Sequence, residues 1–347
     1  MNRIAVIGYG GQGAWHCKQL LGSDVATLAG TYDIREVRCD AARESGIFVY
    51  ESNDALLADP TVDAVVIATP NDSHEELVIR ALRAGKHVIC EKPVEMSVAS
   101  FDRMAEAARE AGRLLTVHQN RRWDVDFLAM KAIVESGEIG DLIDIESRIH
   151  GSRGIPSDWR CTKEQGGGMM LDWGVHLIDQ VLQIVGAPIE KIWCTTSHIT
   201  NSEVDDGFKL EIYFEGGKSA HVEVATYNFL AMPRFYLRCK NGSALIEDWR
   251  KNAQVARLTA WCEKDVTPVQ NAAGITKTMA PRDHLTLDTY EAPRPASDVH
   301  DFYRNFCRAI SGKEEPIVGL SEVRRVMQVM EAALASAESG QPVCTRI

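Results

Sequence analysis

The first 120 residues alternate short apolar runs with stretches of helical periodicity. Strands that alternate with helices at this spacing are typical of a parallel, doubly wound sheet. We therefore expect residues 1–120 to form an α/β domain. Its five predicted strands are Arg3 to Ile7, Val25 to Tyr32, Ala64 to Ala68, His87 to Cys90 and Leu114 to Val117.

One predicted helix of this domain begins with Ser73-His74-Glu75-Glu76. In this pattern the serine hydroxyl and the Glu76 carboxylate can each accept a hydrogen bond from the other residue's backbone N–H group, which forms a capping box. The capping box predicts a β–α turn at Thr69 to Asp72.

The hydrophobic pattern changes near Leu142, after a helical stretch from Phe127 to Glu135. From there to Trp261, long strands are joined by short glycine turns, which favours antiparallel pairing. The predicted strands are Leu142 to His150, Ile189 to Ser197, Lys209 to Phe214, Ala220 to Thr226, Phe235 to Cys239 and Ala244 to Glu247.

One helix, from about Met169 to Val185, interrupts these strands, and two helices, Asp298 to Ile310 and Ser321 to Ser339, close the chain. This mixture predicts a substrate-binding α+β domain over residues 121–347, with a large, mostly antiparallel open sheet. The closing helices can pack back on the first domain.

Composition limits the partners and the compartment. The chain has 347 residues, 45% hydrophobic and 25% charged, which suits two globular domains. A net charge of −11 argues against nucleic acid as a partner, because phosphate binding needs a basic face. Met1 leads directly into a strand, and no window approaches a membrane span, so we expect a cytoplasmic protein without a membrane partner.

The cysteines are scattered along the chain without short spacings, which argues against a disulfide framework or a zinc knuckle. They stand at positions 17, 39, 90, 161, 194, 239, 262, 307 and 344.

The segment Gly8-Tyr9-Gly10-Gly11-Gln12-Gly13 follows the first strand and opens a helix. In a G-x-G-x-x-G pattern the first glycine permits a tight turn, the second lets the backbone approach a pyrophosphate, and the third allows close packing of helix and strand. The helix N-terminus then faces the negative charge. This context predicts a dinucleotide site on a Rossmann-type sheet.

Asp33 lies twenty residues beyond Gly13, at the end of the second predicted strand. It can accept hydrogen bonds from the adenosine ribose hydroxyls and would repel a 2′-phosphate, which favours NAD as the cofactor. Arg35 can partly offset that repulsion, so NADP is disfavoured rather than excluded.

Lys92 follows the fourth predicted strand, between Glu91 and Pro93. The carboxyl end of that strand is where the nicotinamide half of a dinucleotide would reach. The alternative is an exposed lysine that merely ends a strand.

The run from Gly166 to Asp179 carries the other candidate catalytic residues. If it is helical from about Met169, Asp172 and His176 stand at i and i+4 on one face, with Asp179 one turn further. A carboxylate beside an imidazole is a proton-relay arrangement, and a nearby ammonium would shift both pKa values toward the working pH. These residue types also ligate zinc, but the run has no cysteine or second histidine, so we expect no metal site.

With these motifs the chain resembles the Gfo/Idh/MocA family, named for glucose-fructose oxidoreductase and inositol dehydrogenase. The resemblance extends over essentially the whole length. It rests on four motifs in the same order: the glycine fingerprint, Ala68-Thr69-Pro70-Asn71 with His74, Glu91-Lys92-Pro93, and the run from Gly166 to Asp179.

The resemblance implies that Lys92 is the catalytic lysine, Asp172 the substrate-binding carboxylate and His176 the general base. It places Asn71, His74 and Glu91 beside the cofactor. The complete set expected at the cofactor is Gly8, Tyr9, Gly10, Gly11, Gln12, Gly13, Asp33, Ile34, Arg35, Thr69, Pro70, Asn71, His74, Glu91, Lys92, Pro93 and Asn120.

Within the family, the segment Gln119 to Phe127 resembles the scyllo-inositol dehydrogenase branch. Some members of that branch prefer NADP and lack an acid at the position of Asp33. This chain departs from them there.

Polyols and sugars need paired hydrogen-bond partners and flat faces for stacking. Arg121, Arg153 and Trp173 could contribute, but such residues more often belong to the core or to surface ion pairs. The residues expected to bind substrate are Arg122, Trp123, Trp159, Arg160, Asp172 and His176.

The expected function is NAD-dependent oxidation of a secondary hydroxyl in a cyclic polyol, sugar or glycoside. His176 would take the hydroxyl proton and Lys92 would stabilise the developing alkoxide, while the hydride goes to the nicotinamide. The alternatives are a glycosidase that uses bound NAD for transient oxidation, as in one family branch, and a non-catalytic regulator that senses NAD or sugar. A regulator has no reason to keep the three catalytic residues.

The resemblance also implies that the open sheet faces stack between subunits. Two-fold symmetry is the default for such contacts, so we expect a homodimer or a homotetramer.

Overall fold

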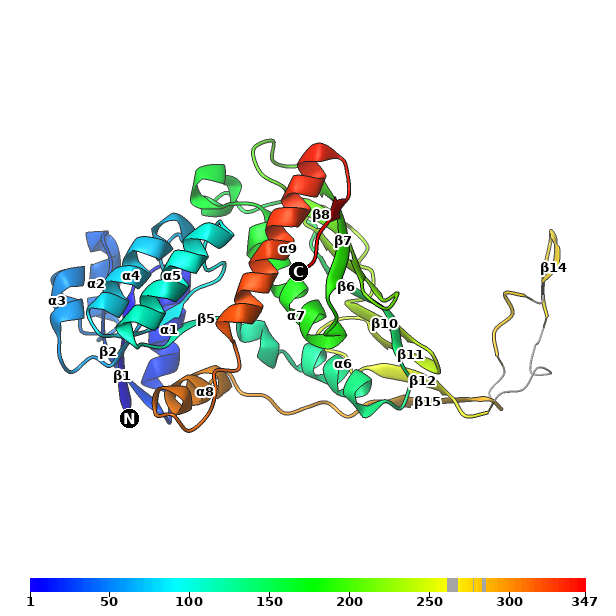
Figure 1. Ribbon diagram of the computed structural model, residues 1–347, viewed down its shortest axis with the longest axis horizontal. Helices are drawn as coiled ribbons and strands as arrows, with labels where there is room; N and C mark the ends of the chain where they lie inside the picture. The colour runs from blue at the N-terminus through cyan, green and yellow to red at the C-terminus, as the bar shows by residue number, and fades with distance from the viewer. Residues whose placement is uncertain (261–267, 277, 283–284) are drawn as a thin grey trace.

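The computed structural model describes residues 1–260, 268–276, 278–282 and 285–347, and its two main sheets are covered by helices (Figure 1). Trp261 and Cys262 lie outside the described residues. The cysteines within the described part are free thiols.

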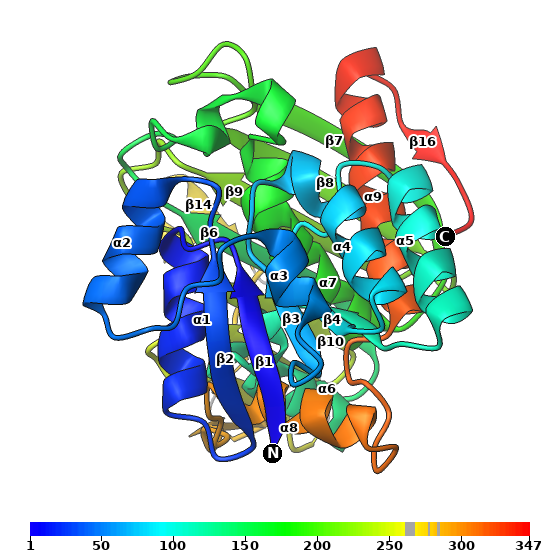
Figure 2. The ribbon, with the colours of Figure 1, turned by 90° about the vertical axis from the view of Figure 1, so that its left-hand side faces the viewer.

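The first sheet is parallel, with the strand order β2-β1-β3-β4-β5. All four residues of β3 are buried, which is typical of a strand with helices on both faces. Helix α1 lies to one side of the strands and α4 and α5 to the other (Figure 2). The strands are β1 (Asn2–Ile7), β2 (Ala26–Tyr32), β3 (Ala64–Ile67), β4 (His87–Cys90) and β5 (Leu115–Val117), and the helices are α1 (Gly11–Leu21), α2 (Glu36–Glu44), α3 (Asn53–Ala58), α4 (His74–Arg83) and α5 (Val98–Ala111).

The second sheet has nine strands in the order β15-β12-β11-β10-β6-β9-β8-β7-β16. Its neighbours pair antiparallel except β6 and β9, which run parallel. The strands are β6 (Leu142–His150), β7 (Ile189–Ser197), β8 (Gly207–Phe214), β9 (Ser219–Ala225), β10 (Phe235–Cys239), β11 (Gly242–Ile246), β12 (Gln254–Leu258), β15 (Leu287–Glu291) and β16 (Val343–Cys344). A separate hairpin, β13 (Val269–Asn271) with β14 (Gly274–Thr276), extends away from the body (Figure 1).

The helices of the second half lie mainly between the two sheets. Helix α9 packs on β7 and α7 and also on α5 and β5 of the parallel sheet, so it joins the two halves (Figure 1). These helices are α6 (Val125–Ser136), α7 (Val175–Val185), α8 (Asp301–Ile310) and α9 (Leu320–Ser339). Short 3₁₀ turns are η1 (Asn71–Ser73), η2 (Asn120–Trp123), η3 (Trp159–Cys161) and η4 (Lys163–Gln165), and η5 (Met170–Gly174) is a π-helical turn.

This architecture confirms the predicted fold class, a Rossmann-type parallel sheet followed by an α+β half with a mostly antiparallel sheet. Strands β12, β15 and β16 enlarge the second sheet beyond the six predicted strands. Of the helices that the structure describes, none is both long and apolar enough to span a membrane.

The predicted capping box at Ser73 is wrong. The Ser73 hydroxyl donates to the Pro70 carbonyl and contacts the Thr69 hydroxyl, both at 2.7 Å, and Glu76 contacts Arg80 instead. The 3₁₀ turn η1 precedes α4 directly and holds the serine side chain on the preceding turn. A serine in a turn bonds its own local backbone as readily as it caps a helix.

Candidate active site

The glycine loop leaves open space where a pyrophosphate would approach. Gly8 has φ +95°, and a Cβ added there would lie 2.6 Å from the Ala68 carbonyl oxygen. A Cβ on Gly13 would lie 1.8 Å from the Gly8 carbonyl oxygen, so both positions require glycine. At Gly10 and Gly11, by contrast, no described atom outside the adjoining backbone lies within 4 Å of an added Cβ. The first turn of α1 therefore presents its backbone to an open cradle that fits a dinucleotide phosphate.

Asp33 follows β2 and contacts the glycine loop at Tyr9. Its carboxylate accepts hydrogen bonds from the backbone N–H groups of Tyr9, at 2.7 Å, and Arg35, at 2.8 Å. Each carboxylate oxygen keeps a second lone pair, which can accept a ribose hydroxyl. The Arg35 Nε atom lies 3.8 Å from Asp33 Oδ1, and its side chain is 60% exposed. Ile34 between them is 89% exposed.

Asn71 and His74, which are expected beside the cofactor, hold neighbouring loops together in the structure. Asn71 is 3% exposed and donates to the Gly166 carbonyl at 3.2 Å. His74 is fully buried, and its ring nitrogens contact the carbonyls of Thr69, Pro93 and Val94. Burial lowers the pKa of His74, so it is a neutral brace under the loop. This geometry argues against direct cofactor contact by His74.

Lys92, directly after β4, meets a carboxylate from the other half of the chain. Its ammonium lies 3.0 Å from Asp172 Oδ1 and 2.9 Å from the Asp172 carbonyl oxygen. Arg160 Nε donates to the second carboxylate oxygen at 2.9 Å. Burial would raise the pKa of Asp172, but the charges of Lys92 and Arg160 outweigh it and hold that pKa below its usual value. The site thus contains an ionised carboxylate flanked by two cations.

His176 is 4% exposed, and its side-chain hydrogen-bond partner among the described residues is Gln119, whose Oε1 lies 3.2 Å from His176 Nδ1. An amide oxygen can only accept, so Nδ1 carries the proton and Nε2 keeps its lone pair. Burial, with the positive charges of Lys92 and Arg121, holds the pKa of His176 well below its usual value. The imidazole is therefore neutral at neutral pH and able to accept a proton at Nε2.

The predicted pairing of Asp172 with His176 across one helical turn is wrong. Residues 170–174 form the π turn η5, in which the Val175 N–H reaches the Met170 carbonyl, and α7 begins only at Val175. Among the hydrogen bonds of the described residues, none joins Asp172 to His176. The extra residue in the turn sends Asp172 toward Lys92 and Arg160, while His176 faces Gln119.

The π turn is anchored by Asp205, which the sequence analysis did not identify. Its side chain accepts from the Met170 N–H at 2.8 Å and its carbonyl from the Met169 N–H at 3.0 Å. Gly168 has φ +103°, and a Cβ there would lie 2.2 Å from Asp205 Oδ1. The triple-glycine stretch before the turn was the available signal.

Two of the predicted substrate residues are committed elsewhere. The Arg122 side chain is 4% exposed and binds both carboxylate oxygens of Asp179, at 2.6 and 2.8 Å, as well as Glu322. Trp123 packs edge-on against Phe302, with ring centroids 5.6 Å apart. Both side chains join helices together, and this geometry argues against the substrate roles expected for them.

Aromatic rings and guanidinium groups gather beside His176. The Trp173 ring centroid lies 6.0 Å from that of His176 and 5.9 Å from that of Trp249, which is 42% exposed. The Arg121 guanidinium lies over the Trp173 ring, 4.3 Å from its centroid. Arg160 lies over Trp159 in the same way, at 4.5 Å. Arg121 and Trp249 were not predicted, because a neighbouring ring contributed by the loop after β11 has no local sequence signal.

The remaining candidate positions differ in their exposure to solvent. Asn120 and Arg160 are partly exposed, and Arg153 is exposed. Glu91 is 4% exposed and carries its own set of contacts, described below.

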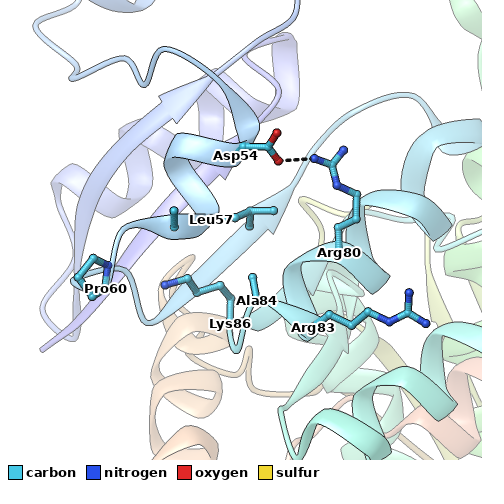
Figure 3. A pocket seen from close by; sticks show the side chains of 8 residues that line it. Asp54, Leu57, Pro60, Arg80, Arg83, Ala84 and Lys86 are labelled. Carbon is cyan, nitrogen blue, oxygen red and sulfur yellow. Dashed lines mark hydrogen bonds and ion pairs between the residues drawn. The ribbon is translucent and has the colours of Figure 1, made fainter.

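A surface hollow lies at the opposite edge of the parallel sheet, beside the amino ends of β3 and β4 (Figure 3). Three of its polar side chains are already paired: Arg80 contacts Asp54 at 2.6 Å, and Lys86 donates to the carbonyls of Asp59 and Val62. Dinucleotides bind at the carboxyl ends of parallel strands, so this hollow belongs to the packing of α3 and α4. It is lined by Asp54, Leu57, Ala58, Pro60, Arg80, Arg83, Ala84 and Lys86.

A dinucleotide cradle on a parallel sheet, joined to a lysine, a carboxylate and a neutral histidine at the carboxyl edge, defines an oxidoreductase of the nicotinamide-dependent class. Comparison with known families supports this class. Residues 2–119 match the oxidoreductase family with an NAD-binding Rossmann fold, and residues 127–245 match the Gfo/Idh/MocA C-terminal domain. The chain belongs to the Gfo/Idh/MocA family of oxidoreductases.

Individual relatives agree. An NAD-binding protein from Listeria innocua, of known structure, is 42% identical, covers 99% of both chains and superposes with a TM-score of 0.95. An uncharacterised oxidoreductase of Schizosaccharomyces pombe is 38% identical over 172 residues, which span 48% of this chain and 47% of that protein. Myo-inositol 2-dehydrogenase of Thermotoga maritima is 34% identical over 204 residues, 58% of this chain and 60% of the relative. The chain thus spans about half of the first curated relative.

Proposed function

We propose that the protein oxidises a secondary hydroxyl of a cyclic polyol, sugar or glycoside, with NAD as the hydride acceptor. The observation that carries this proposal is the neutral His176 near the Lys92 ammonium, with an Nε2 that has no hydrogen-bond partner among the described residues. A relative named for myo-inositol oxidation supports the substrate class.

His176 can accept the hydroxyl proton because its other ring nitrogen is held by Gln119. As that proton leaves, negative charge grows on the substrate oxygen, and the Lys92 ammonium can stabilise it by charge and hydrogen bond. Asp172 holds this ammonium in place through an ion pair. When bound, the nicotinamide cofactor supplies the acceptor for the carbon-bound hydride.

NAD is the favoured cofactor because Asp33 lies at the ribose end of the glycine loop. Its carboxylate is already ordered by two backbone donors, and each oxygen has a second lone pair that can accept a ribose hydroxyl. A 2′-phosphate there would face a like charge, and the Arg35 guanidinium, 3.8 Å away and exposed, offsets it weakly.

The surroundings of His176 suit a ring with several hydroxyls. Arg160 and Asp172 offer donors and acceptors for adjacent hydroxyl groups. The rings of Trp173 and Trp249 offer flat faces on which the apolar side of a cyclic substrate can stack.

A panel of inositols, hexoses and glucosides, incubated with NAD and followed by the absorbance of reduced cofactor, tests the proposal. We expect net reduction with at least one cyclic polyol or sugar, and a rate about 10²- to 10³-fold lower with Lys92→Ala. Release of a glucoside's aglycone without net reduction would identify a glycosidase that oxidises its substrate only transiently. No turnover with any member of the panel would contradict the substrate class.

A further inference from the structure

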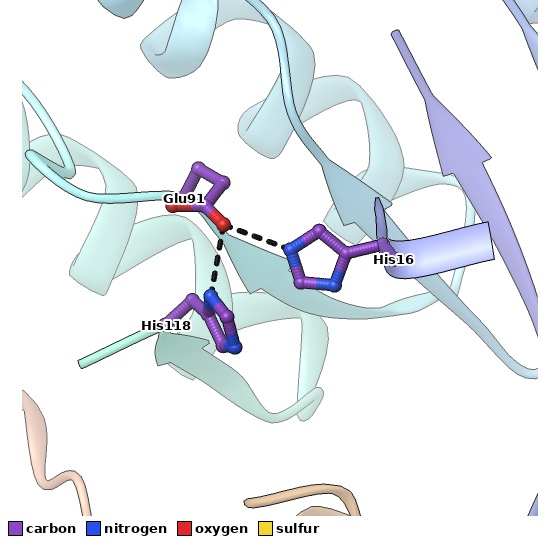
Figure 4. Close-up of side chains that lie close together, drawn as sticks. All are labelled: His16, Glu91 and His118. Carbon is purple, nitrogen blue, oxygen red and sulfur yellow. Dashed lines mark hydrogen bonds and ion pairs between the residues drawn. The ribbon is translucent and has the colours of Figure 1, made fainter. Parts of the chain in front are cut away.

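A buried cluster directly beside Lys92 joins three segments of the chain, which contribute His16, Glu91 and His118 (Figure 4). Glu91 Oε1 lies 2.8 Å from His16 Nε2 and 2.8 Å from His118 Nδ1, and Gln12 donates to the same oxygen at 3.1 Å. The other oxygen, Oε2, accepts the backbone N–H of Lys92 at 3.0 Å. Three side chains therefore hold one carboxylate, and that carboxylate holds the backbone of the lysine.

Burial and the neighbouring side chains determine the protonation states of Glu91 and His16 in this cluster. Burial would raise the pKa of Glu91, but the neighbouring His118 and His16 outweigh it and hold that pKa well below its usual value. Burial lowers the pKa of His16, so its ring is neutral and donates to Glu91 through Nε2. Its Nδ1 then accepts from the Tyr303 hydroxyl, 2.6 Å away. A directed chain runs from Tyr303 through His16 to the Glu91 carboxylate.

These groups come from elements that surround the proposed reaction centre. Gln12 and His16 lie on α1, the helix opened by the glycine loop, and Tyr303 lies on α8. His118 follows β5, and the next residue, Gln119, orients His176. At the end of β5, His118 therefore holds Glu91, and the adjacent Gln119 holds His176.

The cluster has the composition of a metal site, since its three ligand atoms lie within 4.8 Å of one another. Its distances are those of hydrogen bonds. A tetrahedral zinc ion would separate its ligand atoms by about 3.3 Å, whereas both imidazoles approach the carboxylate to 2.8 Å. Every carboxylate oxygen here already has a donor.

We propose that Glu91, held by His16 and His118, is a positioning residue that fixes the backbone at Lys92 and thereby the place of its ammonium beside Asp172. This inference rests on the proposed function of Lys92. Glu91 itself does not touch substrate.

The test uses the full chain without substrate or cofactor. The rate at which acetic anhydride acylates Lys92 is measured by mass spectrometry, with exposed Lys313 as the internal reference. The ion pair with Asp172 holds the Lys92 amine away from the reagent, so a looser pair should expose it more often. We expect Glu91→Gln to acylate Lys92 about three- to tenfold faster than wild type, because the pair opens more often. An unchanged rate would overturn the proposal.

Glu95→Gln is the matched control, because Glu95 is 5% exposed, lies in the same loop and bonds the adjacent Met96 N–H. It should leave the Lys92 rate unchanged. If Glu91→Gln loses its cooperative melting transition, His118→Leu replaces it and should raise the Lys92 rate in the same direction. Zinc content after dialysis tests the metal alternative. If the wild type retains one equivalent of zinc and His118→Leu retains none, the cluster is a metal site and the positioning proposal is wrong.

Once the panel has identified a substrate, the kinetic constants of Glu91→Gln provide a second test. Glu91→Gln should lower kcat about tenfold or more and change KM and NAD affinity less than about twofold, because misplacing a catalytic group affects the chemical step. Equal effects on kcat and NAD affinity would show a general loss of structure. If the panel yields no substrate, the proposed function fails, while the acylation result still decides the role of Glu91.

Discussion

At the residue scale, the protonation state of His176 is the property on which the proposed chemistry depends. Its pKa lies well below the usual value of 6.5, because burial and the charges of Lys92 and Arg121 disfavour the imidazolium. A general base works in its neutral form. Activity should therefore be lost as the pH falls through this lowered pKa.

The pH profile of kcat/KM checks this expectation. We predict that kcat/KM stays level from pH 8 down to about 6.5 and falls only below it. Gln119→Leu, which removes the acceptor at Nδ1, should lower kcat/KM by freeing the ring to adopt the other tautomer. An acid limb centred above pH 7 would show that a different group titrates.

We also expect a single side chain, Asp33, to determine the preference for NAD over NADP. Asp33→Ser removes the charge that would face a 2′-phosphate, so the preference for NAD over NADP should fall by about tenfold, equivalent to 1.4 kcal/mol. Titration of both cofactors into each variant measures this ratio. Glu36→Gln, an exposed acid at the start of α2, is the control and should leave the ratio unchanged. Tighter binding of NADP by the wild type would mean that Arg35 dominates.

The sequence predicted much of the site at this scale. The glycine loop, Asp33 and Lys92 are local motifs that follow strands of the parallel sheet as expected, whereas Asp172 and His176 lack the helical pairing that their spacing predicted. Site roles for Gln119, Arg121 and Trp249 were not predicted, because they arise from contacts between distant segments. Arg122 looked suitable for substrate but is buried against Asp179, a contact that no local pattern announces.

At the scale of elements, the π turn η5 determines where the catalytic side chains point. An apolar run such as Met169 to Leu171 fits an α-helix and a π turn equally well, so periodicity could not separate them. The strands were easier, because alternation and β-branched runs fix both their type and their faces. Short edge strands such as β16 carry too few residues for such a pattern.

The start of this turn provides a stability test. Gly168→Ala should lower the free energy of unfolding by roughly 1–3 kcal/mol, because Gly168 has φ +103° and its Cβ would meet Asp205 Oδ1 at 2.2 Å. Gly46→Ala is the control: φ is +74°, but no described atom beyond its neighbours lies within 4 Å of the added Cβ. Denaturant melts of both variants separate clash from backbone strain. Equal losses in the two would contradict the packing of Asp205 against Gly168.

At the scale of the whole molecule, the C-terminal helices tie the two sheets together. Helix α8 reaches the loop between α1 and β2 through Arg304 and Asp24, and α9 reaches α5 through Arg324 and Asp102. These pairs are separated by more than two hundred residues, which is why the sequence left their placement open. The Tyr303–His16 contact belongs to the same junction.

The outer face of the nine-stranded sheet is the surface we propose for self-association. On β7 and β8 it exposes Trp193, at 45%, and Tyr213, at 37%, while the other face packs on α7 and α9. Light scattering at micromolar concentration should give a mass of at least twice 38.4 kDa. Trp193→Glu should shift the protein toward monomer, whereas Leu21→Glu, on α1 and 65% exposed, should not. A monomeric wild type would mean that this face is solvated.

The central claim is that the Lys92 ammonium, paired with Asp172, drives hydride transfer from a hydroxyl. The most direct test is the turnover of Lys92→Ala with a substrate from the panel, together with NAD affinity by titration. One charge-assisted donor to a developing oxyanion is worth about 10²- to 10³-fold in rate, so kcat should fall by that factor while NAD affinity stays within about twofold. Lys313→Ala, exposed after α8, is the control. An unchanged kcat in Lys92→Ala would contradict the account.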